Sequence, residues 1–301
     1  IWLGLQVNLY SFILIILMSN KNQEKEAAVK YFISQVVPSA VLMAFFLIPS
    51  TKLSLIFLMV SMLMKMGAAP FHFWLPSVMG AMSWSSCLLL STIQKIGPMF
   101  ILIFLSSLSL FILIFTSVAS SLIGGLGGMN QTMLRVLLSY SSIGHMGWIL
   151  SVIIFDKVVC FAYLVSYIVV ISCLILMLDY LSAFSVNFIF TTGKSKFEVF
   201  SLIFLFLSLG GLPPFFGFFP KMMVLWSLSS NFMFILSFGL ILGSVLNLYY
   251  YLKIIFISLL SNSSSVLDSS SSYLVNYNLM TSAVLMVSLF GGLGLVFSIL
   301  V

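Results

Sequence analysis

The chain has 301 residues, of which 62% are hydrophobic and 6% are charged. Soluble globular domains carry roughly a quarter charged residues, so this composition excludes that class and indicates an all-α polytopic membrane protein. The net charge of +6 does not indicate nucleic-acid binding, because the basic residues are scattered and form no patch interleaved with stacking aromatics.

Reading about twenty apolar residues per membrane span predicts about ten transmembrane helices. The first five cover residues 1–18, 27–48, 53–76, 83–105 and 107–128. The second five cover residues 133–155, 158–180, 198–225, 231–258 and 276–300. We expect one integral membrane domain with an N-terminal set of helices (1–130) and a C-terminal set (131–301).

The basic residues of the predicted loops favour one side of the membrane, which carries Lys21, Lys25, Arg135, Lys194 and Lys196. The positive-inside rule assigns that side to the cytoplasm or the mitochondrial matrix. The chain opens with Ile rather than Met. Either residues precede it, or a non-standard start codon has been read literally, and the second option suits an organelle-encoded protein.

The third span contains the string KMGAAPFHFWLP at residues 65–76. Pro70 lacks an N–H and its ring clashes with a preceding carbonyl, so the helix must kink or unwind there. Lys65 lies about one and a half turns before that break. A lysine at bilayer depth costs roughly 2.5–3.5 kcal/mol and usually marks an ion or proton path. The alternative is a snorkelling lysine, but Lys65 lies far from both ends of its span.

The eighth span contains a second interruption, GGLPPFFGFFPK, at residues 210–221. A helix cannot continue through Pro213, Pro214 and the surrounding glycines, and Lys221 follows directly. Paired interruptions in corresponding parts of two halves predict two inverted repeats and a transport site between them.

Lys95 lies in the middle of the fourth span, within the string TIQKIGP at residues 92–98. Pro98 can bend that helix and free carbonyl groups. Because Lys95 falls between the two broken helices in sequence, it suits a relay. The alternative is a structural lysine bonded to the freed carbonyls.

His72 and His145 are the only histidines. His145 ends a polar stripe that includes Tyr140 and Ser141, and hydroxyl groups beside an imidazole can hold ordered water and pass a proton. Interhelical hydrogen bonding explains the stripe equally well. Neither histidine has a Glu or Cys at the spacing of a metal site, so we expect no bound metal.

Three strings, KMGAAPFHFWLP (65–76), GGMNQTMLRVLLSYSSIGHMGW (127–148) and GGLPPFFGFFPK (210–221), closely resemble the chain 2 family of mitochondrial NADH–ubiquinone oxidoreductase, respiratory complex I. The strings EAAVKYFISQ (26–35) and IQKIGP (93–98) fit the same family. The likeness covers nearly the whole chain in order.

The resemblance implies an antiporter-like membrane-arm subunit with two inverted five-helix repeats, in the mitochondrial inner membrane and mitochondrially encoded. It assigns proton transfer to Lys65, Lys95 and Lys221. It implies that NADH, FMN, iron–sulfur clusters and ubiquinone are bound by other subunits, so we expect no cofactor in this chain. The implied partners are other membrane-arm subunits, accessory subunits and phospholipid, including cardiolipin, without nucleic acid. The chain is expected to lack one N-terminal helix of most animal versions.

One position departs from the family pattern W-x-G-x-E-x-N, in which the glutamate is the counter-charge to the first lysine. Here the string is WLGLQVN at residues 2–8, with Gln6 at that position. Gln6 can hydrogen-bond Lys65 but carries no negative charge, and burial disfavours an uncompensated ammonium. Glu26 could substitute, although it lies at the mouth of the second span.

Because Gln6 stands in place of the glutamate, two functional hypotheses remain open. In the first, the chain translocates protons for complex I. In the second, it is a structural spacer of the membrane arm with an impaired proton path. A free-standing cation/proton antiporter ranks last, because it would need acidic cation ligands within the membrane and only Asp179 comes close.

Overall fold

The computed structural model describes residues 2–18, 21–47, 51–105, 109–186 and 196–265. In those ranges the chain is helical and forms no β-strand beyond an isolated bridge between Met133 and Ser185. The helices are α1 (Trp2–Leu17), α2 (Asn22–Leu47), α3 (Thr51–Met66), α4 (Trp74–Ala81), α5 (Trp84–Ser91), α6 (Ile93–Phe104), α7 (Leu110–Gly128), α8 (Leu134–Val152), α9 (Lys157–Tyr180), α10 (Lys196–Gly210), α11 (Phe218–Ser230) and α12 (Phe234–Ser265). The all-α prediction is confirmed.

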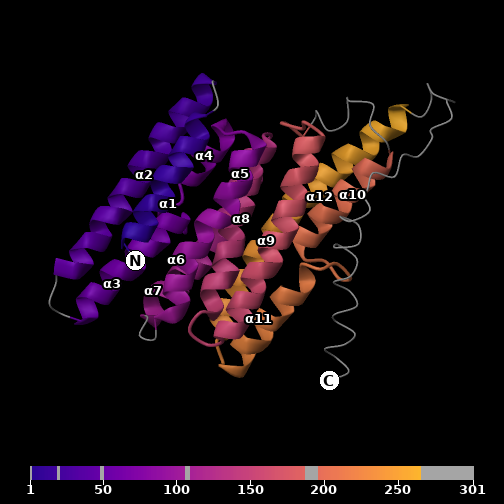
Figure 1. Ribbon diagram of the computed structural model, residues 1–301. Helices are drawn as coiled ribbons and strands as arrows, with labels where there is room; N and C mark the ends of the chain where they lie inside the picture. Colours follow the sequence, from indigo (N-terminus) through magenta and orange to yellow (C-terminus); the bar gives the residue numbers. More distant parts are fainter. Residues whose placement is uncertain (1, 19–20, 48–50, 106–108, 187–195, 266–301) are drawn as a thin grey trace.

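The helices lie side by side as one bundle, with α1–α4 on one flank, α7–α9 in the middle and α10–α12 on the other flank (Figure 1). Helix α8 is almost entirely buried. It packs closely on α7, because a Cβ added to Gly124 would come within 2.6 Å of the Gly144 backbone nitrogen. Such close approach between small residues is how apolar helices associate within a membrane.

Both predicted broken helices are present, and they share a backbone plan. Helix α3 stops before Gly67, which has a φ of 71°, and α10 stops before Gly211, which has a φ of 73°. This left-handed conformation favours glycine and ends each helix. A proline follows three residues later in each case, Pro70 in the first break and Pro214 in the second. The equivalent breaks therefore arise from equivalent local sequences.

A third interruption lies in the span that Pro98 was expected to bend, but at a position that the sequence did not predict. Helix α5 ends at Ser91 and α6 begins at Ile93, with Thr92 between them. We expected Pro98 to bend this span, whereas Pro98 lies inside α6 and the break falls before Lys95. The physical reason is that a proline ring clashes with the carbonyl four residues earlier, so the helix is disturbed on the N-terminal side of the proline.

Five helical segments of the described residues are long and apolar enough to cross a membrane: 22–47, 84–104 (α5 and α6 together), 110–128, 157–180 and 234–258. The predicted spans 53–76 and 198–225 are divided into shorter helices by their breaks, and α1 has 16 residues. The predicted span 276–300 lies outside the described residues. The structure therefore supports a multi-pass membrane protein, while the predicted number of ten spans stays a prediction.

Candidate functional site

The three lysines singled out from the sequence are all buried in the bundle. Lys65 lies in the last turn of α3, Lys95 in the first turn of α6 and Lys221 in the first turn of α11. Their exposed fractions are 6%, 4% and 7%. Each lysine therefore sits at a helix end created by a break inside the bundle, where backbone groups without helical partners are available to it.

Lys65 and Lys95 line the same small cavity, although thirty residues separate them in sequence. The cavity has a volume of about 20 Å³, which is enough for one water molecule. Its other polar walls are Asn8, Tyr31, Gln35 and Gln94. A cavity of this size can hold one water that hydrogen-bonds several of these polar groups.

Amides form one wall of that cavity. Asn8 donates from Nδ2 to Gln94 Oε1 at 2.9 Å, and Gln94 donates from Nε2 to Asn8 Oδ1 at 3.0 Å. The Tyr31 hydroxyl also donates to Gln94 Oε1, at 3.3 Å. This reciprocal pair ties α1 to α6 with neutral groups, and no salt bridge to Lys65 exists among the described residues.

Lys95 leads from the cavity into a row of aromatic side chains on α8 and α9. Its Nζ donates to the Tyr167 hydroxyl at 3.3 Å and lies 5.1 Å from the Tyr167 ring centroid. The Tyr167 ring is 5.3 Å from the His145 ring, and His145 Nδ1 is 3.0 Å from the Tyr163 hydroxyl. Tyr163 in turn stacks on Trp148. Hydroxyl and imidazole groups of this kind can both accept and donate protons.

Lys221 approaches the same row from the other flank. Its Nζ lies 6.0 Å from the Trp148 ring centroid and donates to the Gly210 carbonyl at 2.7 Å. That carbonyl ends α10, so the lysine satisfies a backbone group left free by the second break. The structure thus brings Lys65, Lys95, His145 and Lys221 together along the middle of the bundle.

Several predicted residues lie apart from this row. His72 bonds the Pro70 carbonyl through Nδ1 at 3.2 Å, within the loop of the first break. The Ser141 hydroxyl donates to the Leu138 carbonyl of its own helix, and the Tyr140 ring packs over Gly127. The Ser141 side chain also lies within hydrogen-bonding reach of the Tyr251 hydroxyl. A relay role for these three residues remains a prediction.

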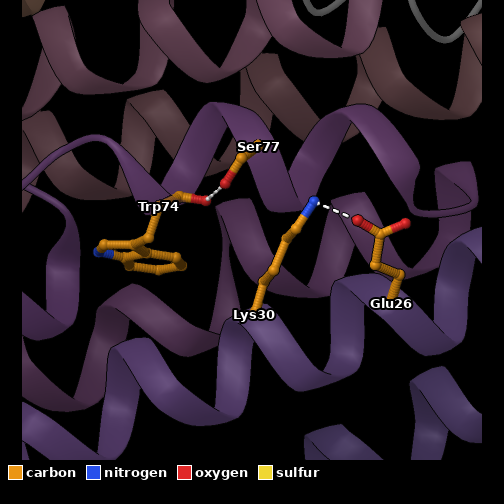
Figure 2. Close-up of polar contacts among 4 residues, drawn as sticks. All are labelled: Glu26, Lys30, Trp74 and Ser77. Carbon is orange, nitrogen blue, oxygen red and sulfur yellow. Dashed lines mark hydrogen bonds and ion pairs between the residues drawn. The ribbon is translucent and has the colours of Figure 1, made fainter.

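The two candidate counter-charge positions also lie away from Lys65. No hydrogen bond joins the half-buried Gln6 to Lys65, and Gln6 does not line the shared cavity, although Asn8 of the same motif does. Glu26 is exposed and pairs with Lys30, whose Nζ lies 2.6 Å from Glu26 Oε1 (Figure 2). Figure 2 also shows the Trp74 backbone carbonyl, which accepts a hydrogen bond from the Ser77 hydroxyl.

Sequence reasoning missed the tyrosines. Tyr163 and Tyr167 are four residues apart, which places both on one face of α9, and this spacing inside an apolar span was the available signal. Helix α12 adds Asn247, Tyr250 and Tyr251 at helical spacing. Asn247 Oδ1 and His145 Nε2 are buried without a hydrogen-bond partner among the described residues. Buried polar atoms of this kind usually bond ordered water.

The comparisons with known proteins identify the family. The model of the NADH:quinone oxidoreductase/Mrp antiporter transmembrane family matches residues 1–247. NADH-ubiquinone oxidoreductase chain 2 of Lumbricus terrestris is 41% identical over 277 residues, covering 86% of this chain and 80% of that protein. The chain belongs to the NADH-ubiquinone oxidoreductase chain 2 family. Chain 2 of Locusta migratoria is 37% identical over 307 residues and covers 98% and 88% of the two chains.

Membership of the chain 2 family confirms the predicted enzyme, a membrane subunit of NADH:ubiquinone oxidoreductase. The fold agrees with this. A chain of respiratory complex I from Thermus thermophilus superposes with a TM-score of 0.78 at 21% identity, covering 98% of this chain and 71% of that one. A chain of the archaeal membrane-bound sulfane sulfur reductase gives 0.81 at 14% identity, with coverages of 98% and 68%. At these identities the likenesses establish the antiporter-like fold alone.

The described residues offer few groups for a metal. No set of three His, Cys, Asp or Glu side chains gathers in the part of the chain that the structure describes. The chemistry available at the site is therefore that of amines, phenols, an imidazole and amides, which suits the storage and transfer of protons.

Proposed function

We propose that this chain translocates protons across the mitochondrial inner membrane as the antiporter-like subunit of complex I, with Lys65, Lys95 and Lys221 as the proton carriers. NADH oxidation and ubiquinone reduction take place in other subunits, which also hold the flavin, the iron–sulfur clusters and the quinone. Membrane-arm neighbours, accessory subunits and phospholipid, including cardiolipin, complete its surroundings.

One observation supports this proposal above the others. A series of polar contacts runs through the bundle, beginning at the cavity shared by Lys65 and Lys95. It continues through Tyr167, His145 and Tyr163. Buried lysines readily change between charged and neutral forms, because burial opposes the ammonium while nearby dipoles and water support it. Such groups at intervals can pass a proton laterally through the membrane.

The test is a comparison of lysine variants in the assembled complex. Lys95→Met removes the central carrier, and we expect fewer protons pumped per electron transferred in coupled membrane vesicles. Lys253→Met is the matched control, because Lys253 lies in the apolar helix α12 but is exposed. Equal ratios in the two variants would remove Lys95 from the pathway.

A structural spacer is the second candidate, and a specific observation favours it. Lys65 faces neutral amides in its cavity and has no ion pair among the described residues. A charge that cannot be switched by a nearby carboxylate is harder to move. A high-resolution map of the assembled complex separates the two functions, since a dry cavity between Lys65 and Lys95 supports the spacer and ordered water supports translocation.

A further inference from the structure

Glu24 differs from the other acidic residues of the chain. The sequence contains six Asp and Glu residues, and among the described ones Glu24 alone is buried, with an exposed fraction of 3%. Glu26, two residues later on the same helix, has a side chain that is 66% exposed and forms a salt bridge with Lys30 (Figure 2). An acid in the first turn of a helix is stabilised by the helix dipole without being buried. Its burial therefore needs another explanation.

Other charged and polar residues lie in the same part of the bundle as Glu24. Glu24 and Arg135 both lie near enough to the Cys87 thiol to act on it electrostatically. Arg135 donates to the Met82 carbonyl, in the connection between α4 and α5, and the hydroxyls of Ser83 and Ser86 in the same region are 3.0 Å apart. The same end carries the exposed Lys21 and Lys25. Charged and polar side chains thus gather at this end of the bundle, on the lysine- and arginine-rich side of the membrane.

The buried face of α2 runs from Glu24 toward the cavity of Lys65 and Lys95. Glu24, Ala28, Tyr31 and Gln35 follow one another at spacings of four, three and four residues, which places them on one face of the helix, and all four are buried. The Tyr31 hydroxyl bonds Gln94, and Gln35 Nε2 donates to the Lys65 carbonyl at 3.4 Å. Ala27 and Ala28 are the small residues between the acid and the tyrosine.

The distance decides which role Glu24 can have. Eleven residues separate it from Gln35, which at 1.5 Å per residue is about 16 Å along the helix axis. That separation rules out an ion pair between Glu24 and Lys65, so Glu24 does not replace the family's counter-charge. A buried carboxylate near the start of α2, on the same helix face as Tyr31 and Gln35, instead suits the uptake of protons from the aqueous phase.

We propose that Glu24 is the proton-uptake residue of this subunit. It takes protons from the lysine- and arginine-rich side of the membrane and passes them to the cavity of Lys65 and Lys95. The carboxylate accepts a proton from a hydronium ion, which becomes water as the new O–H bond forms. It then releases that proton to water beside Ala28 and Tyr31, and the proton ends on the neutral amine of Lys65, which becomes an ammonium. The carboxylate is regenerated. This inference rests on the proposed function, since it requires Lys65 to be a carrier.

The test compares Glu24→Gln with Glu26→Gln in the assembled complex, measured as protons pumped per electron in coupled vesicles. We expect Glu24→Gln to lower the ratio as far as Lys65→Met does, Glu24→Asp to restore most of it, and Glu26→Gln to match the unmodified complex. Electron transfer in uncoupled membranes reports assembly. Equal ratios for Glu24→Gln and Glu26→Gln would overturn the assignment.

If the Glu24→Gln variant does not assemble, a second measurement tests the proposal. In a high-resolution map of the unmodified complex, ordered water between the Glu24 carboxylate and the Tyr31 hydroxyl supports the uptake route, and close-packed side chains without water there overturn it. The two proposals fail separately. If Lys65→Met and Lys95→Met leave the ratio unchanged, proton translocation itself fails, whereas if they lower it and Glu24→Gln does not, only the uptake role fails.

Discussion

In the first broken helix, neutral side chains satisfy the carbonyls that end α3, whereas in the second a lysine satisfies the carbonyl that ends α10. Trp74 Nε1 donates to the Met64 carbonyl at 3.2 Å, and Gln35 donates to the Lys65 carbonyl. Lys221 Nζ itself donates to the Gly210 carbonyl. The two breaks share a backbone plan but leave their lysines in different situations.

The difference shows that a buried lysine can either line a cavity or satisfy a backbone carbonyl at a helix break. Because Trp74 and Gln35 bond the backbone of the first break, the Lys65 ammonium is not engaged there and lines the small cavity instead. Lys221 must give up a charge-assisted hydrogen bond before it can release or move its proton. The proposed proton transfer would therefore leave the first break intact, whereas at the second break it would disturb a hydrogen bond that holds the end of α10.

The largest expected effect comes from the glycines that end α3 and α10. An alanine at either position adopts an unfavourable left-handed conformation at roughly 1–2 kcal/mol. At Gly211 the new Cβ would also lie 2.6 Å from Lys221 Nζ, while at Gly67 its nearest neighbour is a Leu75 methyl at 3.1 Å. We expect Gly211→Ala to destabilise the subunit by about 2–4 kcal/mol and Gly67→Ala by about 1–2 kcal/mol.

The temperature of half-inactivation of the solubilised complex measures this difference, and proton pumping provides a second readout. Gly211→Ala should lower the ratio of protons to electrons, because it displaces the ammonium of Lys221. The comparison between the two breaks fails if Gly67→Ala is the more damaging substitution.

The second prediction concerns the lysines themselves. Lys65→Met and Lys221→Met both remove a buried charge, so relief from desolvation is common to the two variants. Only Lys221→Met leaves a buried carbonyl, that of Gly210, without its donor. We expect it to be less stable than Lys65→Met by about 1–3 kcal/mol. Heat inactivation of the two complexes side by side gives the answer, and equal stabilities would show that the Lys221 bond contributes nothing to the break.

A smaller effect is expected at Trp74. Trp74→Phe keeps an aromatic ring but removes one of the two donors to the Met64 carbonyl, the other being the Gly67 N–H, and this should cost about 1 kcal/mol. The matched control is Trp226→Phe, because Trp226 on α11 is 73% exposed. Thermal inactivation distinguishes them, and a control as unstable as Trp74→Phe would mean that the hydrogen bond does not hold the first break together.

The smallest effect is expected at Gln6. The side chain is half-buried, makes no hydrogen bond to Lys65 and does not line the cavity, so Gln6→Glu should change the ratio of protons to electrons little. Pumping by Gln6→Glu and by the unmodified complex, assayed in the same vesicles, tests this. A clear rise in the ratio would show that a carboxylate at position 6 reaches Lys65 after all, and that this chain lacks a working counter-charge.

The sequence determined the class of fold, the two broken helices and the three buried lysines. The physical reason is that these features depend on local chemistry. Pro70 and Pro214 cannot continue a helix, Gly67 and Gly211 permit the turn that ends one, and a lysine inside a long apolar run has no route to solvent within its own helix. No tertiary contact is needed to predict them.

Tertiary packing alone decided which residues surround those lysines. The partners of Lys95 and His145 are tyrosines from another helix, and Asn8 meets Gln94 across 86 residues of sequence. Glu24 and Glu26 show the same limit, since they are identical side chains two residues apart whose burial differs because opposite faces of α2 meet the bundle and the outside. A sequence gives the spacing of a helical face, but the neighbours of that face depend on how the helices pack.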